Sequence, residues 1–398
     1  MPHAIALYTK AWESSGAGLF AQELVGGMLD AGAEVVFVAP PAEEPRFDAP
    51  RPGLVRFTPP RELKQGGRLA RIAASLRRVG GAAWGLLRAR RRARVFVVTI
   101  PDPLVFAAPL LALLRLSGAR VIYVVHDPVP HAWQLSARWR WIERLGYRAV
   151  YHLASALVVL SAPGRDALRA AWGLGDKPIA VIEHGVFTLP DTAPAPGAGR
   201  VLVFGTLRRN KGIREAIEGV VAARARGVPV RLLIAGAPDP IEPDYWADCA
   251  AIAAAHPDAI ELDIGFVAQD RLSALIARCD AFLLPYRDFH SQSGVAMLAA
   301  SNARALIAAR AGGIGALIAE GMAAMPIEAP VGAPQVAEAL AAFFVTPLAV
   351  WEARARAYRT RTLESRAWPV IGEHYVALAR SLARGSARLP ATADEGGR

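Results

Sequence analysis

The sequence predicts an α/β protein with two doubly wound parallel sheets, each in a domain of its own. Its 398 residues exceed what a single ordinary core contains, so two domains are expected. Short β-branched runs alternate with alanine- and arginine-rich helical stretches, which is the pattern of βαβ units around a parallel sheet. This alternation stops once, between residues 187 and 199, and then begins again.

Seven short apolar runs predict the strands of the first domain, residues 1–186. They are Ala4–Tyr8, Glu34–Ala39, Leu54–Phe57, Val95–Ile100, Val121–Val125, Ala156–Leu160 and Ile179–Ile182. Helices fit between them, for example Leu19–Ala31, Arg68–Arg90 and Arg138–Leu153. Parallel sheets bind ligands at the carboxyl ends of their strands, so we expect functional residues in the loops that follow the strands.

Residues 187–199 predict a linker, because two Ala-Pro steps, Pro190 and a glycine pair interrupt the pattern. The second domain, residues 200–350, repeats the alternation. Its predicted strands are Val201–Phe204, Arg231–Ala235, Ile260–Ile264, Ala281–Pro285 and Ala305–Ala308, with helices at Arg214–Ala225 and Leu272–Arg278. Residues 351–385 predict C-terminal helices that pack back across a central cleft between the domains, and residues 386–398 a flexible tail.

The composition excludes several protein classes. Apolar residues make up 53% and charged residues 20%, which is typical of a folded chain. The two cysteines, Cys249 and Cys279, have no metal-type spacing, so neither a disulfide framework nor a structural zinc site is expected. The N-terminus does not read as a signal peptide. The longest apolar stretch, Leu104–Leu114, is too short for the roughly twenty residues that cross a bilayer. We therefore expect a cytoplasmic protein, soluble or peripheral to the membrane.

The loop after Val201–Phe204 carries the residues of a phosphate-binding turn. Gly205 lets the backbone approach a ligand, and Arg208 and Lys211 supply positive charge. The helix that follows adds its N-terminal dipole. This set suits a diphosphate, although a basic loop with a helix cap remains an alternative.

A second polar loop follows the predicted strand Ala281–Pro285. It places small hydrogen-bond donors and free backbone amides at a helix N-terminus. Its residues are Ser291, Gln292, Ser293, Gly294 and Val295. Alone, this loop is also compatible with an ordinary serine N-cap.

Six motifs in order resemble glycosyltransferase family 4 over nearly the whole chain. They are the glycine-rich loop Ser14–Gly18, His126-Asp127, His184-Gly185, Lys211-Gly212, Gly265-Phe266-Val267 and Gly312-Gly313. The resemblance implies the GT-B fold and a GDP- or UDP-sugar donor. It also implies hexose transfer with retention of configuration. We expect no metal or other cofactor. The implied acceptor is lipid-linked or a polysaccharide, at the cytoplasmic face of the membrane.

The resemblance and the chemistry of the leaving group together assign the candidate residues. Departure of a nucleoside diphosphate creates negative charge that preorganised cations and amides can stabilise. The candidate catalytic residues are His126, Arg208 and Lys211. The candidate donor-binding residues are Gly16, Gly18, Gly205, Phe266, Val267, Ser291, Gln292, Ser293, Gly294, Val295 and Glu320. No Asp-x-Asp metal motif is evident, so no metal ligands are assigned.

The sequence departs from the family at three positions. The family's paired glutamates align with Ser291 and Ala299, and its phosphate-loop arginine aligns with Thr206. We expect Arg208 to take the charge role of that arginine, and another residue such as Glu320 to hold the ribose. The departures also leave two alternatives open. One is a catalytically inactive nucleotide-sugar-binding partner subunit, and the other is an epimerase of the same fold.

One segment is strongly basic. Eleven basic residues and one acid lie between Arg61 and Arg94, which accounts for most of the net charge of +11. An apolar stripe recurs within it at helical spacing, formed by Leu69, Ile72, Leu76, Val79 and Ala83. Trp133, Trp139 and Trp141 mix with further arginines downstream. The segment predicts either an anchor on an anionic membrane surface or a docked helix with a solvated arginine face. Nucleic-acid binding is not expected, because no recognition motif accompanies the charge.

Overall fold

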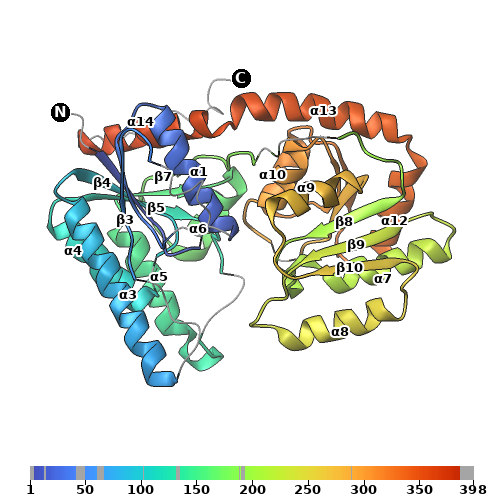
Figure 1. Cartoon of the computed structure of the whole chain (residues 1–398), viewed down its shortest axis with the longest axis horizontal. Helices are drawn as coiled ribbons and strands as arrows, with labels where there is room; N and C mark the ends of the chain where they lie inside the picture. The colour runs from blue at the N-terminus through green and yellow to red at the C-terminus, as the bar shows by residue number, and fades with distance from the viewer. Residues whose placement is uncertain are drawn as a thin grey trace. The chain divides into compact units, whose positions relative to one another are not determined.

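The computed structural model of the chain describes residues 4–12, 15–41, 50–60, 67–101, 103–130, 135–187, 189, 193–287 and 289–385. It divides into two compact units, shown in Figure 1. The first unit holds the described residues up to Gly185 together with those from Arg366 on, and the second is Val186–Ser365. The expected tail, residues 386–398, and part of the expected linker lie outside the described residues.

The first unit contains a seven-stranded parallel sheet in the order β3-β2-β1-β4-β5-β6-β7. Its strands are β1 Ala4–Tyr8, β2 Val35–Val38, β3 Leu54–Phe57, β4 Ala93–Val98, β5 Arg120–Val125, β6 Ala156–Val159 and β7 Ile179–Val181. Its helices are α1 Gly16–Asp30, α3 Arg68–Ala89, α4 Leu104–Leu116, η1 Ala137–Trp139, α5 Arg140–Leu153, α6 Ala162–Trp172 and α14 Trp368–Ala383. The predicted strands of this half are confirmed, with β4 shifted by two residues.

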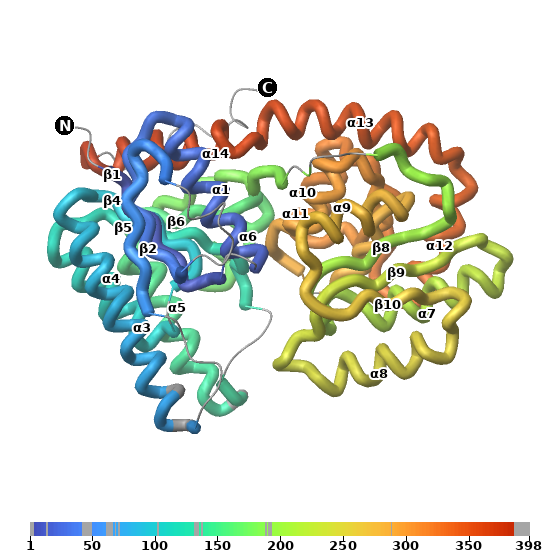
Figure 2. The backbone as a smooth tube through the Cα atoms, in the orientation of Figure 1, coloured from blue at the N-terminus to red at the C-terminus, as the bar shows by residue number. Residues whose placement is uncertain are grey.

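The strand order places the helices on two faces of this sheet. The chain moves one way from β1 to β3 and then the other way from β4 to β7. Right-handed crossovers therefore put α1 on one face and α3, α4, α5 and α6 on the other. Helix α14 packs on α1 and on β4 and β5, so it shares the face of α1, as the tube in Figure 2 also shows.

Two glycines bring α1 and α14 into close contact. A Cβ on Gly27 would lie 2.0 Å from the carbonyl oxygen of Trp368, and one on Gly372 would lie 2.1 Å from the backbone of Gly27. Only residues without a side chain allow this approach. The C-terminal helix thereby becomes part of the core of the first unit.

The second unit contains a six-stranded parallel sheet in the order β10-β9-β8-β11-β12-β13. Its strands are β8 Arg200–Phe204, β9 Arg231–Gly236, β10 Ile260–Ile264, β11 Ala281–Leu284, β12 Ala305–Ala309 and β13 Ala324–Ile327. Its helices are η2 Arg209–Lys211, α7 Ile213–Ala225, α8 Pro243–Ala254, α9 Gln269–Ala277, α10 Gly294–Ser301, α11 Gly312–Ala319, α12 Ala333–Val345 and α13 Leu348–Ser365. The sequence did not predict β13, which contains Pro326 and lies at the edge of the sheet, where proline is tolerated.

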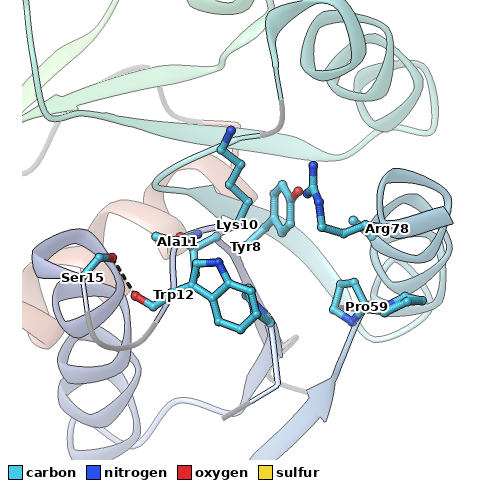
Figure 3. Close-up of a pocket in the computed structure, with 11 residues that line it drawn as sticks. Tyr8, Lys10, Ala11, Trp12, Ser15, Pro59 and Arg78 are labelled. Carbon is cyan, nitrogen blue, oxygen red and sulfur yellow. Dashed lines mark hydrogen bonds between the residues drawn. The ribbon is translucent and has the colours of Figure 1, made fainter. Parts of the chain in front are cut away.

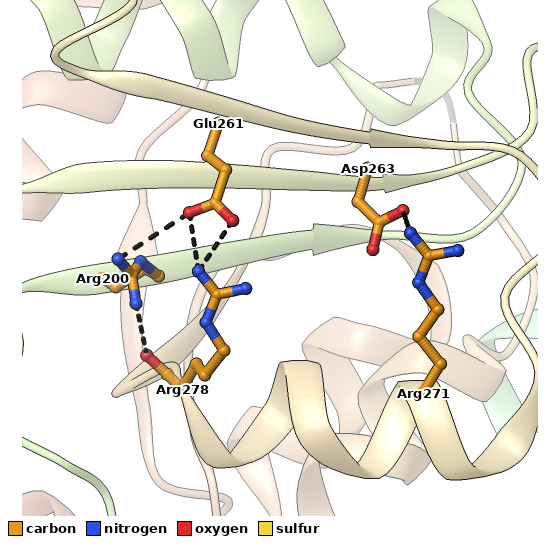
Figure 4. Close-up of polar contacts among 5 residues, drawn as sticks. All are labelled: Arg200, Glu261, Asp263, Arg271 and Arg278. Atoms are coloured by element: carbon orange, nitrogen blue, oxygen red, sulfur yellow. Dashed lines mark hydrogen bonds and ion pairs between the residues drawn. The ribbon is translucent and has the colours of Figure 1, made fainter.

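The opposite edge strand, β10, carries charged residues (Figure 4). Glu261 accepts hydrogen bonds from Nη2 of Arg278 at 2.7 and 2.9 Å and lies 3.7 Å from Nη2 of Arg200. Asp263 pairs with Arg271 of α9. Charges on an edge strand oppose pairing with a strand of another chain.

Helix α3 buries a different face from the one its apolar stripe indicated. Its buried positions include Ala74, Ala82, Leu86 and Ala89. Leu69, Ile72 and Leu76 of the stripe are exposed, and Val79 and Ala83 are half-buried. The first half of the stripe is therefore not docked on the described core.

Candidate functional site

Three neighbouring strands of the second unit end in glycines with positive φ angles. These angles are 107° at Gly205, 142° at Gly236 and 136° at Gly265. The amide of Gly205 donates to the carbonyl of Ala235, and that of Gly265 donates to the carbonyl of Gly236, both at 3.0 Å. A Cβ on Gly236 would lie 2.0 Å from the carbonyl oxygen of Gly205. The backbone is therefore closely packed at the carboxyl ends of β8 and β9, where only glycine fits at position 236.

Lys211 lies in the turn between β8 and α7. Its Nζ donates to the carbonyl of Phe204 at 3.4 Å and lies 5.5 Å from the centre of the Tyr286 ring. A Cβ on Gly205 would lie 2.8 Å from the same Nζ. Burial, together with the nearby charge of Arg208, lowers the pKa of Lys211 to about 7. The ammonium is thus directed at the strand-end glycine, where an anion would favour its charged form.

The loop after β11 packs directly on this turn. Gly212 has a φ of 66°, and a Cβ there would lie 2.0 Å from the carbonyl oxygen of Pro285. The amide of Arg287 donates to the carbonyl of Asn210 at 2.8 Å, and its Nη1 donates to Glu215 at 2.6 Å. These contacts join the two loops that the sequence assigned to the donor.

The N-terminus of helix α10 lies beside Gly205. Ser293 caps the helix, since its Oγ accepts the amide of Ala296 at 3.2 Å. Gly294 is the first residue of α10, and Cγ2 of Val295 lies 3.8 Å from the position of a Cβ on Gly205. The predicted residues Gly205, Lys211, Gly294 and Val295 therefore come together.

The residues before α10 are held by Gly312 and Gly313, the first two residues of α11. The amide of Gly313 donates to the carbonyl of Ser291 at 2.9 Å, and a Cβ on Gly313 would lie 2.0 Å from Oε1 of Gln292. Nε2 of Gln292 lies 3.5 Å from the sulfur of Met297. Ser291 is buried. The start of α11 therefore supports the loop that precedes α10.

Phe266 and Val267 follow β10 and differ in exposure. The Phe266 side chain is 63% exposed, whereas Val267 packs against the core beneath α10. An exposed aromatic ring beside the strand ends can stack on a planar base.

The candidate residues of the first unit gather around Phe20. His126, at the end of β5, makes an edge contact with the Phe20 ring at 5.0 Å, and His184 does so at 5.2 Å. Burial lowers the pKa of each histidine to about 4, so both rings are neutral near pH 7. Nδ1 of His184 donates to the carbonyl of Gly185 at 2.6 Å. Within the described residues, Nε2 of His126 is buried and has no hydrogen-bond partner.

The glycine-rich loop becomes the start of α1. Ser15 is the N-cap, and its Oγ accepts the amide of Gly18 at 3.0 Å. Gly16 begins the helix, and a Cβ there would meet nothing within 4 Å. Ser14 lies outside the described residues. Beside this loop is a pocket of about 250 Å³, lined by Lys10, Trp12 and other residues shown in Figure 3.

The assignment of Glu320 to the ribose is wrong. Glu320 caps the C-terminus of α11, which runs from the carboxyl end of β12 back to the start of β13. It therefore lies at the amino edge of the sheet, opposite the donor loops, where it accepts a hydrogen bond from Tyr358 Oη at 3.1 Å. Ala299, at the position of the family's second glutamate, is fully buried within α10.

Three residues of this edge were not among the sequence candidates. The Nδ2 and Oδ1 atoms of Asn210 are buried, and neither has a hydrogen-bond partner in the described part of the chain. The sequence feature that could have identified Asn210 was its position between two basic residues, Arg209 and Lys211. Gly236 was marked by its position at the end of a predicted strand. Arg287 links the loops through its backbone amide, and the sequence gives no sign of that contact.

Comparison with known proteins then decides the family. The sequence model of Glycosyltransferase Family 4 matches residues 14–188, and that of Glycosyl transferases group 1 matches residues 198–345. The chain belongs to glycosyltransferase family 4. Of the described residues, none form a group of three or more His, Cys, Asp or Glu side chains placed to hold a metal ion.

One relative of this family 4 member matches about half of the chain. The chain is 28% identical over 205 residues to the GDP-mannose:glycolipid 4-beta-D-mannosyltransferase of Xanthomonas campestris, a match that covers 51% of this chain and 53% of that enzyme. The chain thus spans about half the length of that relative.

Two solved structures share the fold over almost the whole chain. A sucrose-phosphate synthase from Thermosynechococcus elongatus has a TM-score of 0.73 at 18% identity, covering 96% of this chain and 100% of the other. Anabaena HepE, in complex with UDP and glucose, has a TM-score of 0.68 at 16% identity and the same coverage. The expected GT-B fold is confirmed.

Proposed function

We propose that this protein is a glycosyltransferase that moves a hexose from a GDP- or UDP-sugar to a lipid-linked or polysaccharide acceptor at the cytoplasmic face of the membrane. The observation that carries the proposal is the convergence of Lys211 Nζ and the N-terminus of α10 on Gly205. A lysine beside open backbone amides stabilises the charge of a departing nucleoside diphosphate.

The names of the similar proteins support this class of donor. The Xanthomonas relative is named for GDP-mannose and a glycolipid, and the Anabaena structure contains UDP and glucose. The exposed Phe266 ring provides a surface for either base. The donor is identified by the thermal shift that each nucleoside diphosphate produces, because only a ligand that binds the folded state raises the melting temperature.

Retention of configuration and metal independence are the finer parts of the proposal. Retention is tested from the anomeric proton coupling of the product by NMR. The test matters because one relative is named a 4-beta-D-mannosyltransferase. Metal independence predicts the same turnover with and without a strong chelator, since Arg208, Lys211 and the helix amides would stabilise the leaving group.

The alternative is an inactive nucleotide-sugar-binding subunit, and one observation favours it. The positions of the family's two glutamates hold Ser291 and Ala299, both buried, so neither offers a carboxylate to the donor. Incubation of the purified protein with radiolabelled donors and membrane extract separates the two functions. Nucleotide binding without transfer to any acceptor would favour the subunit.

A further inference from the structure

Exposed large apolar side chains are concentrated on one part of the first unit. In the described residues, thirteen of the nineteen lie on α3, α4 and residues 135–145. Leu69 of α3 is 83% exposed and Leu116 of α4 is 86% exposed. Scattered exposed apolar residues need no explanation, but such a concentration marks an interaction surface.

The helices that carry most of these residues are neighbours in the fold. Helices α3, α4 and α5 cover the same face of the first sheet, and α4 contacts both of its neighbours (Figures 1 and 2). The exposed side of each therefore faces away from that sheet. We call this the α3–α5 surface, formed by Leu69, Ile72, Leu76, Val105, Leu113, Leu116, Trp139, Trp141, Ile142 and Leu145.

Helix α5 adds positive charge to the apolar residues. Trp141, Arg144, Leu145 and Arg148 recur at three- and four-residue intervals, so they share one helical face. All four are exposed, Trp141 and Leu145 by 59% each. Neither arginine takes part in any ion pair formed among the described residues.

The same four residues line a groove between α5 and α6. The groove has a volume of about 480 Å³ and is completed by Ala171, Trp172 and Gly173. The guanidinium of Arg144 lies over the Trp172 ring at 5.7 Å. The Trp172 side chain is held in position by a hydrogen bond, because its Nε1 donates to the carbonyl of Pro128 at 2.7 Å. The groove thus brings two arginines together with an exposed and an anchored tryptophan.

We propose that the α3–α5 surface docks on an anionic phospholipid bilayer. Trp141, Leu145 and the exposed leucines of α3 enter the interfacial region, where tryptophan and apolar side chains are favoured. Arg144 and Arg148 bind lipid phosphates in the groove, and Arg138, Arg140 and Arg77 add attraction to the charged surface. This deepens the proposed function, because it rests on an acceptor that is presented at a membrane.

The charges favour a bilayer over a second copy of the chain. A two-fold symmetric contact would bring the arginine-rich patch of one copy against the same patch of the other, which is repulsive. An anionic lipid surface instead complements every one of these arginines. None of the helices in the described ranges is, by itself, long and apolar enough to cross a bilayer, and only the bent combination of α12 with α13 and α14 meets the length and composition.

The charge requirement is tested with full-length protein and vesicles. Wild-type protein should sediment with equimolar phosphatidylglycerol and phosphatidylcholine vesicles, and not with phosphatidylcholine alone. Binding should weaken between about 0.1 M and about 1 M salt, as the screening length falls from about 10 to about 3 Å. The triple variant Arg140→Gln, Arg144→Gln, Arg148→Gln should lose at least about tenfold in affinity.

A matched control removes three charges elsewhere. Arg226, Arg231 and Arg380 are also exposed, and their joint replacement by glutamine should change vesicle affinity less than about twofold. Equal losses in both triple variants would show that net charge alone is responsible and would overturn the docking surface.

The apolar requirement has its own pair of variants. Trp141→Gln with Leu145→Gln should weaken vesicle binding at least about tenfold, and blue-shifted tryptophan emission on binding should diminish. Ile241→Gln with Val345→Gln, which also replaces exposed apolar residues, should not. Wild-type binding that survives the first pair unchanged would contradict insertion of this face.

Two further measurements separate this inference from the proposed function. The GDP- or UDP-induced thermal shift should be the same in all of these variants, because the donor loops belong to the second unit. A wild-type shift without vesicle binding would overturn only the docking surface, whereas vesicle binding without a shift would overturn only the donor assignment. Wild-type dimers that dissociate in the α5 variants, seen by light scattering without lipid binding, would assign the surface to a second copy.

Discussion

Lys211, in the loop after β8, has low exposure, yet its proposed role requires a charged side chain. Burial and Arg208 lower the pKa of Lys211 to about 7, so near neutrality only part of the protein carries this ammonium. A bound diphosphate reverses the balance, because an opposite charge favours the protonated form. Binding and protonation at this residue are therefore linked.

Replacing Lys211 tests its role in transfer directly. Lys211→Ala should lower kcat by about 10² to 10³, as loss of one preorganised donor to a developing charge does elsewhere. The melting temperature should not fall. Lys177→Ala is the control, since Lys177 also has a pKa lowered by burial but belongs to the first unit. Near-wild-type turnover of Lys211→Ala would contradict the phosphate-loop assignment.

The pH dependence of donor binding follows from the same pKa. Free Lys211 is charged below pH 7 and neutral above it, while the complex keeps the charge to a higher pH. Affinity should thus be constant below pH 7 and fall by about tenfold per pH unit above it, until the pKa of the complex is reached.

Calorimetry with a nucleotide sugar in buffers of different ionisation enthalpy should show uptake of about one proton near pH 8. The Lys211→Ala variant is the control, because its affinity should not fall with pH in this range. A wild-type affinity that is flat from pH 7 to pH 9 would show that Lys211 does not contact the anion.

At the scale of elements, the site depends on how closely two loops approach. Gly212 has a positive φ, and a side chain there would collide with the carbonyl of Pro285. The loop after β8 can therefore pack on the loop after β11 only if this position is glycine.

A pair of glycine variants separates collision from backbone strain. Gly212→Ala and Gly227→Ala both place alanine at positive φ, which costs about 1–2 kcal/mol, but Gly227 has open space around it. Gly212→Ala should lose a further 1–3 kcal/mol or so of unfolding free energy from overpacking. It should also lose nucleotide affinity, measured by thermal shift. Equal effects of the two substitutions would contradict the close packing of these loops.

The strands and the loop motifs could be predicted from the sequence, since both depend on local signals. Short apolar runs such as Ala4–Tyr8 predicted strands at nearly the observed positions. The assignment of Glu320 failed because sequence order does not show which edge of the sheet a residue reaches. Asn210 could not be predicted, because the burial of its side-chain amide depends on how the loop folds.

The α3 stripe shows a second limit of sequence reasoning. Periodicity identified an apolar face around Leu76, but a helix with small residues such as Ala82 on another side can bury that side instead. The alanines together with Leu86, rather than the leucines of the stripe, marked the buried face of α3. Close packing favoured the smaller side chains there.

At the scale of the molecule, the chain leaves the first unit at Gly185 and returns to it at Arg366. Helix α14 then covers α1 and two central strands. Its buried side chains include Ile371, Tyr375, Val376, Leu378 and Leu382. Each buried apolar side chain of this size contributes about 1.5–3 kcal/mol, so together they are comparable with the roughly 5–15 kcal/mol that stabilises a domain.

Truncation after Ser365 should therefore unfold one unit and leave the other. The shortened chain should lose the thermal transition of the first unit, while the second keeps its own transition and its nucleotide-induced shift. Differential scanning calorimetry distinguishes these events. As a control, removal of residues 386–398 alone should leave both transitions unchanged. A first unit that melts normally without α14 would contradict the packing of α14 on α1.

The glycine contact between α1 and α14 also sets an order of events on the ribosome. Helix α1 is translated before the second unit, and the partner that packs against Gly27 only after all 180 residues of that unit. Roughly 340 residues separate Gly27 from Gly372, so at about 5–20 residues per second the apolar face of α1 remains uncovered for on the order of 20–70 s. The unit that is translated second is therefore the first that can be completed. During that interval the nascent first unit is the part of the chain that a chaperone would have to protect.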